Sequence, residues 1–153
     1  MITIKVGIKN KLPSTLLLLN NAIGFGMNMG AMRVSKGIVS KAQSILSPYN
    51  KSGDLSRAIQ AIGNREGIVT KTFARWDVFV NTDKAPYAMW VELGKFAGEE
   101  LPYAKVGTTD YSKSRFVGHR YLERALEEYK SSNKASLIVA NAIREQTIKL
   151  RNM

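Results

Sequence analysis

Residues 12–46 read LPSTLLLLNNAIGFGMNMGAMRVSKGIVSKAQSIL, and this stretch decides how the rest of the chain can fold. Apolar side chains recur in it at steps of three and four, with one longer gap at Gly30, which predicts a long helix with one apolar stripe. Ser14 can cap its start, and the residue before Pro48 must leave the helix near Leu46. The stripe consists of Leu16, Leu19, Ile23, Met27, Val34, Ile38, Ala42 and Ile45.

No charged side chain occurs between Lys11 and Arg33, so this half of the helix must be buried in its own domain, in a neighbouring subunit or in a membrane. Three asparagines in the run count against a membrane span. Four glycines weaken an isolated helix by roughly 1 kcal/mol each, so close approach of a second backbone is the better reason for them. We therefore expect a surface that packs against protein. The glycines are Gly24, Gly26, Gly30 and Gly37, and the asparagines are Asn20, Asn21 and Asn28.

Length and composition predict a single domain over residues 1–153, of which 44% are apolar. The absence of cysteine excludes disulfides, thiolate metal sites and cysteine nucleophiles, and a reducing cytoplasm fits it best. The net charge of +11 is concentrated at the two ends, since residues 1–53 carry seven Lys or Arg and no Asp or Glu, and residues 101–153 carry ten against five. Such an excess favours a polyanion, an acidic membrane or an acidic protein ring, and a solvated basic surface is equally compatible with it.

Strands are predicted on both sides of the long helix. Residues 2–9 alternate between apolar and polar side chains, as a half-buried strand does. A turn at Pro48–Gly53 precedes a short segment capped by Asp54, in which residues 57–62 fit helix or strand equally well. A hairpin loop at 63–67 then leads to one bent strand or two over 68–80. We expect a small antiparallel sheet of about three or four strands, whose edges are open to a neighbour.

A short helix is predicted over Pro86–Leu93, after a loop at 81–85, with Gly94 closing it in the left-handed conformation. This helix is apolar nearly all round, so it should be buried in a core or between subunits. Glu92 is its one charge and lies near the C-terminus, where the helix dipole disfavours an anion. We therefore expect a basic partner for Glu92, most simply in a salt bridge within the chain.

Residues 95–118 show no clear period and are the best candidate for an arm that contacts another protein. From Arg120 onward the apolar spacing predicts a second long helix, which residues 131–133 can kink or interrupt. The predicted fold class is thus α+β: two long helices packed on a small antiparallel sheet, with a short third helix and a long loop. Aromatic and basic side chains are mixed in the arm, namely Tyr103, Tyr111, Phe116, Lys105, Lys113 and Arg115.

The sequence carries no pattern typical of catalysis. His119 is the only histidine, so no second imidazole can complete a metal site or a proton relay. The glycines at 24, 26 and 30 miss the dinucleotide-binding fingerprint by one residue and lie inside a helical period. Neighbouring carboxylates at 99–100 and 127–128 point apart, which makes them poor acid–base pairs. We expect no enzyme, no metal site and no cofactor.

Three segments of the chain resemble one family of bacteriophage proteins, the head-tail joining or tail-completion (neck) proteins of long-tailed phages. They are SPYNKSGDLSRAI at 47–59, APYAMWVELG at 85–94 and HRYLERAL at 119–126. The order strand, long helix, small sheet, short helix, long helix is similar to that family along nearly the whole chain. The sequence departs from the usual pattern at Lys95, where threonine is common, and at Arg120, where proline is common.

The resemblance implies a structural virion protein, made in the bacterial cytoplasm, that forms a homo-oligomeric ring, most often a hexamer. Such a ring joins head-closure or adaptor proteins to the tail terminator or tube, and the double-stranded DNA genome passes through it. The expected oligomer or partner interface comprises Tyr87, Trp90, Val91, Glu92, Lys95, Tyr103, Lys105, Tyr111, Lys113, Arg115 and Phe116. The expected structural motif positions are Pro48, Gly53, Leu55, Ala88, Gly94 and Leu122.

Two other functions are compatible with the same sequence. A small DNA-binding protein could use the basic ends, and its affinity would then fall steeply with salt. A membrane-active lysis factor could use residues 12–32, which are just long enough to span a bilayer. Recovery of the protein without detergent would argue against the second function.

Overall fold

A computed structural model describes residues 2–7, 17–48, 53–63, 73–95, 105–106, 109–110 and 116–151. Within them it confirms an α+β fold with long helices and a small antiparallel sheet. The elements are β1 (Ile2–Gly7), α1 (Leu17–Leu46), α2 (Asp54–Ala58), β2 (Ile59–Gly63), β3 (Phe73–Val80), α3 (Ala88–Leu93), β4 (Gly94–Lys95), β5 (Lys105–Val106), β6 (Thr109–Asp110), β7 (Phe116–Val117), α4 (Tyr121–Ser131) and α5 (Lys134–Arg151).

The main sheet has the strand order β1-β3-β2, and both pairings are antiparallel. Ile2 of β1 and Ala61 of β2 both lie opposite Val78 of β3, which is fully buried. The remaining short strands pair as β4 with β7 and β5 with β6. Segment 95–118, for which the sequence shows no period, therefore contains two-residue strands in its described parts.

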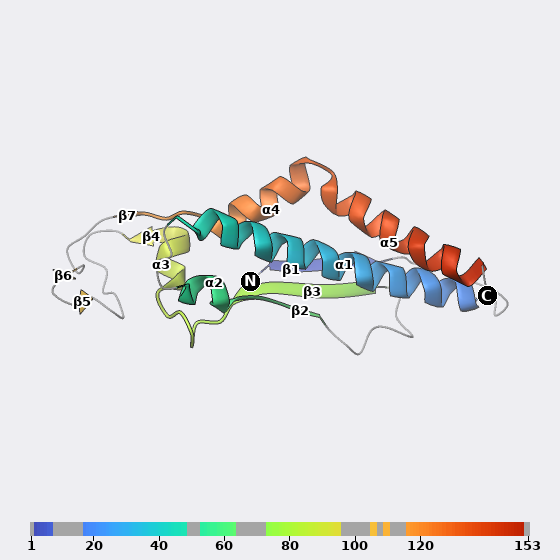
Figure 1. The fold of residues 1–153 in the computed structure, drawn as a ribbon, viewed down its shortest axis with the longest axis horizontal. Helices are drawn as coiled ribbons and strands as arrows, with labels where there is room; N and C mark the ends of the chain where they lie inside the picture. The colour runs from blue at the N-terminus through green and yellow to red at the C-terminus, as the bar shows by residue number, and fades with distance from the viewer. Residues whose placement is uncertain are drawn as a thin grey trace.

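The helix α1 is the centre of the fold (Figure 1). Thirty residues give it a length of about 45 Å. One side of α1 packs on the sheet, and another side packs on α4 and α5. Both sides contribute to one core cluster, in which residues of α1 (Val34, Ile38, Ala42, Leu46) meet Val78 of the sheet and Tyr121, Ala125 and Tyr129 of α4.

Two glycines of α1 lie where the backbone of α5 comes closest. A Cβ atom added to Gly26 would lie 2.5 Å from the Cα atom of Ile143, and one added to Gly30 would lie 2.7 Å from the Cα atom of Val139. No side chain fits at such separations, so only glycine permits this helix–helix contact. The expectation that a second backbone explains these glycines is confirmed at both positions.

The uncharged half of α1 is only partly covered by its own domain. Met27 and Ala31 are buried between the sheet and α5, and Asn28 accepts a hydrogen bond of 3.0 Å from the Trp76 indole. Leu18 and Phe25, in contrast, stay 67% and 40% exposed. Among the described residues no helix has the length and hydropathy that a membrane span requires.

Several predicted boundaries differ from the structure. The description of α1 begins at Leu17, so the expected start near Ser14 lies outside the described residues. The N-cap of α2 is Gly53, with φ of 77°, and Asp54 lies in the first turn, where it pairs with Arg57 at 2.6 Å. The expectation that Asp54 caps this helix is therefore wrong. The ambiguous residues 57–62 divide between the end of α2 and β2.

The second long helix is interrupted where the sequence allows it. Ser132 and Asn133 separate α4 from α5, and Asn133 takes a φ of 53°, which few residues other than asparagine, aspartate and glycine tolerate. The bend turns α5 back along α1 (Figure 1). The C-terminal half of the predicted second long helix is therefore α5, and it packs on α1. The sequence analysis predicted that both long helices pack on the sheet.

Candidate functional site

An open apolar groove of about 470 Å³ lies at one end of the main sheet. It lies between α3, the first turns of α4 and the adjoining ends of β1 and β3. We call it the apolar groove. Its lining residues are Ile2, Phe79, Val80, Thr82, Ala88, Met89, Glu92, Leu93, Tyr121, Leu122, Glu123 and Leu126.

One wall of the apolar groove is α3, which begins two residues later than the sequence predicts. Pro86 and Tyr87 form a turn, and the first i to i−4 hydrogen bond of the helix runs from the Val91 amide to the Tyr87 carbonyl at 3.2 Å. Ala88 is buried, but Met89 and Leu93 are 63% and 64% exposed. The expectation of burial all round therefore does not hold within a single chain, and two large apolar side chains face solvent.

Glu92 holds the first turn of α4. Its carboxylate accepts hydrogen bonds from the backbone amides of Leu122 and Glu123, at 3.1 and 3.2 Å. The free amides at the start of a helix carry partial positive charge. They therefore stabilise the Glu92 carboxylate, which the dipole at the C-terminus of α3 disfavours. The prediction of a basic side-chain partner is wrong: among the described contacts of Glu92, the partner is the start of another helix.

Residues 118–120, between β7 and α4, pack closely against the C-terminal end of α3. The amides of His119 and Arg120 donate to the carbonyls of Val91 and Glu92, at 2.8 and 3.0 Å. A Cβ atom at Gly118 would clash with the carbonyl oxygen of Glu92. Arg120 takes a φ of 47°. Proline cannot adopt this φ, although the family that the sequence resembles often has proline at this position. Glu92 therefore caps a helix that has no side-chain cap at Arg120.

Gly94 ends α3 with a φ of 90° and a ψ of 176°. The positive φ agrees with the prediction, but the ψ is extended, so the expected left-handed helical closure is wrong. The chain leaves the helix directly into β4, which pairs with β7. This pairing brings the segment before α4 back to the end of α3.

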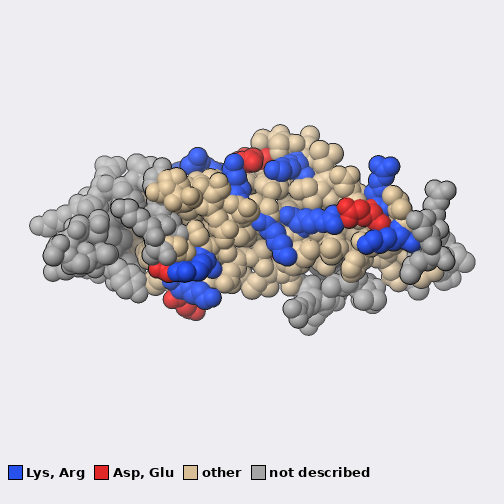
Figure 2. Space-filling model, in the orientation of Figure 1, with Lys and Arg blue, Asp and Glu red and all other residues tan. Residues whose placement is uncertain are grey.

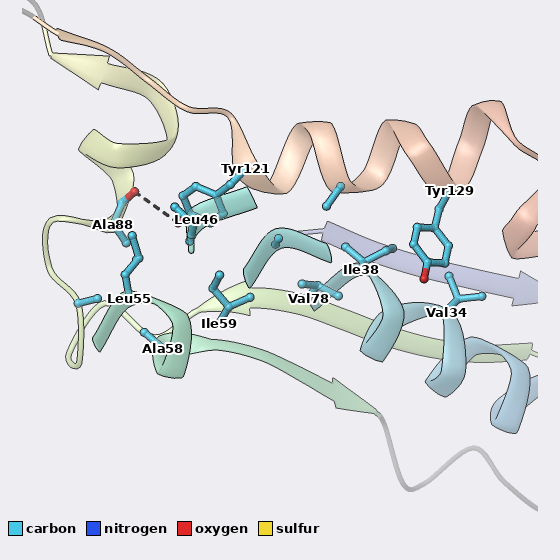
Figure 3. Packing of buried hydrophobic residues seen from close by; sticks show 13 residues of the cluster. Val34, Ile38, Leu46, Leu55, Ala58, Ile59, Val78, Ala88, Tyr121 and Tyr129 are labelled. Atoms are coloured by element: carbon cyan, nitrogen blue, oxygen red, sulfur yellow. Dashed lines mark hydrogen bonds between the residues drawn. The ribbon is translucent and has the colours of Figure 1, made fainter. Parts of the chain in front are cut away.

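The three segments that carry the family resemblance meet at this end of the core (Figure 3). Leu55 and Ala58 come from the first segment, Ala88 from the second and Tyr121 from the third, and all four are buried in one cluster. Tyr121 is fully buried, and its hydroxyl donates a long hydrogen bond of 3.5 Å to the Ala88 carbonyl. Burial, followed by the charge of Glu92 and by Tyr87, raises the pKa of the Tyr121 phenol.

The expected interface residues fall into three groups. Glu92, with the motif positions Ala88 and Leu122, lines the apolar groove; Tyr87 and Val91 pack against the core, and Trp90 is half-buried. Lys95, Lys105 and Phe116 lie in the short strands β4, β5 and β7. Tyr103, Tyr111, Lys113 and Arg115 lie outside the described residues. Among the structural motif positions, Leu55 is in the core, Gly53 caps α2, Gly94 ends α3 and Pro48 lies in the turn after α1.

The sequence did not indicate Met89, Leu93 or Tyr121 as site residues, although their apolar spacing was visible. The groove is chemically simple, because apolar side chains dominate its lining and Glu92 and Glu123 are its acidic members. Within the described ranges no group of three metal-ligating side chains lies close enough to hold an ion. Shape and apolarity suit this groove to binding part of a protein.

Replacing Glu92 with alanine should lower the free energy of unfolding by about 1 kcal/mol, because two amides at the start of α4 lose their acceptor. Urea titration followed by circular dichroism measures this change. Glu127→Ala is the matched control, since Glu127 makes an exposed ion pair with Lys130 on the same helix, at 3.3 Å, and its loss should cost about 0.3 kcal/mol. Equal costs for the two variants would contradict the capping role.

Comparison with known proteins gives no match to any protein family, curated protein or solved structure.

Proposed function

We propose that this protein is a structural connector of a tailed bacteriophage neck. It assembles into a homo-oligomeric ring, joins head-closure or adaptor proteins to the tail terminator or tube, and lets the DNA genome pass. The proposed location is the virion, at the head–tail junction. On this proposal the chain performs no catalysis.

The observation that carries the proposal is the meeting of the three resembling segments at one end of the molecule. At least 24 residues separate them along the chain, yet they share one core cluster, and the second and third segments also line the apolar groove. The element order strand, long helix, small sheet, short helix and C-terminal helices also agrees with what the resemblance implies. This agreement of order and contact supports the family more than any one short motif does.

Two apolar surfaces at opposite ends of the folded molecule support assembly. One is the apolar groove with Met89 and Leu93, and the other is the start of α1, where Leu18 and Phe25 are exposed close to the end of α5 (Figure 1). A head-to-tail ring needs two unlike surfaces on every subunit, and these two are built from different elements. Exposed apolar area of this kind is typical of surfaces that a partner covers.

The test uses a variant that changes an exposed groove residue without touching the core. Native mass spectrometry of the purified protein should give a closed oligomer for the wild type and monomers for Leu93→Glu. Leu137→Glu is the matched control, since Leu137 on α5 is 62% exposed, against 64% for Leu93, and lies away from the groove. The control should assemble like the wild type.

A second measurement covers rings that form only on assembled particles. Peptide mass spectrometry of virions from the phage that encodes this chain should detect it at a few copies per particle, and imaging should place it in the neck. A wild-type protein that is strictly monomeric and also absent from virions would overturn the proposal. Loss of assembly in both leucine variants would remove the groove as the subunit contact.

A further inference from the structure

The positive charge of the described residues is concentrated on the helical side of the molecule. The helices α1, α4 and α5 carry nine Lys or Arg and four Glu, whereas β1–β4, α2, α3 and the turn at 81–87 carry five Lys or Arg and four Asp or Glu. Figure 2 shows Lys and Arg spread along the face that the helices present, with few acidic groups between them. We call this surface the basic face.

Two of the four carboxylates on the basic face, Glu145 and Glu128, are each shared between two cations. Glu145 binds Arg33 through two hydrogen bonds of 2.9 and 2.8 Å, and these, with the weaker effect of Lys149, hold the pKa of Glu145 below its ordinary value. Glu128 contacts Lys41 at 2.6 Å and Lys134 at 3.9 Å in the same way. Each such group keeps a net positive charge, so the ion pairs do not neutralise the face.

Three further cations add to these groups. Lys36 is exposed on α1, one turn from Arg33, and Arg144 is exposed on the outer side of α5. Lys149 is exposed near the end of α5. Along α5 the distance from Lys134 to Lys149 is about 22 Å. The cations of α1, Arg33, Lys36 and Lys41, extend this row on the neighbouring helix.

We propose that the basic face binds the phosphate backbone of double-stranded DNA without reading its base sequence. Duplex DNA presents one negative charge per roughly 1.7 Å of its axis, which suits an extended row of cations. Contacts from Lys and Arg to phosphates position a protein but carry no sequence information. Proteins that prefer single strands add several exposed aromatic side chains on which bases stack. On the described helices α1, α4 and α5, Tyr121 and Tyr129 are buried, and Phe25 alone is exposed, at 40%.

This proposal stands apart from the connector function, because one folded subunit carries the whole basic face. A monomer would bind DNA in the same way. A protein that assembles but binds no DNA would refute this inference and leave the connector proposal intact.

The test compares two variants that lower the formal charge equally, from +11 to +8. The face variant combines Lys36→Gln, Arg144→Gln and Lys149→Gln, and the control combines Arg57→Gln, Arg75→Gln and Lys84→Gln on the sheet side. Fluorescence anisotropy with a 30-base-pair duplex at low salt should show affinity at least about tenfold weaker for the face variant. The control should stay within about twofold of the wild type.

The salt dependence gives an independent readout. Each phosphate contact contributes about 0.9 to the slope of log K against log salt, so losing three contacts should make the slope shallower by about 2.7. Duplexes of unrelated sequence should bind within about threefold of one another. Equal weakening by both variants, tighter binding of a single strand, or binding only to anionic vesicles or to polyglutamate would overturn the proposal, as would no DNA binding by the wild type at low salt.

Discussion

Replacing Gly26 with alanine is expected to lower the free energy of unfolding by about 2 kcal/mol, although alanine is the better helix former by roughly 1 kcal/mol. The new Cβ would lie 2.5 Å from the Cα atom of Ile143 and 3.1 Å from the carbonyl oxygen of Ala142. Both are backbone atoms, so no rotamer change relieves the clash and α5 must move away from α1. For a chain of this length, thermal unfolding should shift down by about 4–8 °C.

Ser40→Ala is the control for helix propensity. Ser40 is exposed on the same helix, so alanine there should raise the free energy of unfolding by about 0.5 kcal/mol. Adding Gly30→Ala to Gly26→Ala should cost less than the sum of the two single changes, because the same displacement of α5 relieves both clashes. A Gly26→Ala protein as stable as the wild type would show that the two backbones are not in close contact.

The sequence predicted α1 well because local rules decide its pattern. The apolar stripe and the residue before Pro48 gave its end at Leu46, and the glycines indicated a second backbone. Which element supplies that backbone was beyond these rules. An apolar stripe says only that some surface is covered, and the turn at Ser132 and Asn133 decides that α5 covers the side of α1 that carries Gly26 and Gly30.

The apolar groove was not predictable from the sequence, because its walls come from β1, β3, α3 and α4. The sequence indicated Glu92 as a residue that needs a partner, which is correct. It led to the wrong partner, because the start of α4 carries its positive charge on backbone amides, and a count of charged side chains does not include them. Pattern analysis likewise left open whether the core or a neighbouring subunit buries α3, since an apolar sequence does not reveal how much of the helix its own chain covers.

Replacing Tyr121 with alanine should lower the free energy of unfolding by about 4 kcal/mol, the largest effect that we expect from a single side chain. Tyr121 is fully buried beside Ala88, in the cluster that also holds Leu55 and Ala58 (Figure 3). Removal of its ring leaves a cavity behind the apolar groove, and the well-packed surroundings can fill only part of it. Urea unfolding followed by tryptophan fluorescence measures the loss.

Tyr121→Phe separates the ring from the hydroxyl. The hydrogen bond to the Ala88 carbonyl is 3.5 Å long, at the limit of a useful geometry, so its loss should cost about 0.5 kcal/mol. The phenylalanine protein should also keep its assembly state and its affinity for DNA, because the ring that supports α3 and the start of α4 remains. If phenylalanine were as harmful as alanine, the hydroxyl rather than ring packing would hold this end of the molecule together. If alanine cost less than 1 kcal/mol, the three segments would not form the cooperative core on which the groove depends.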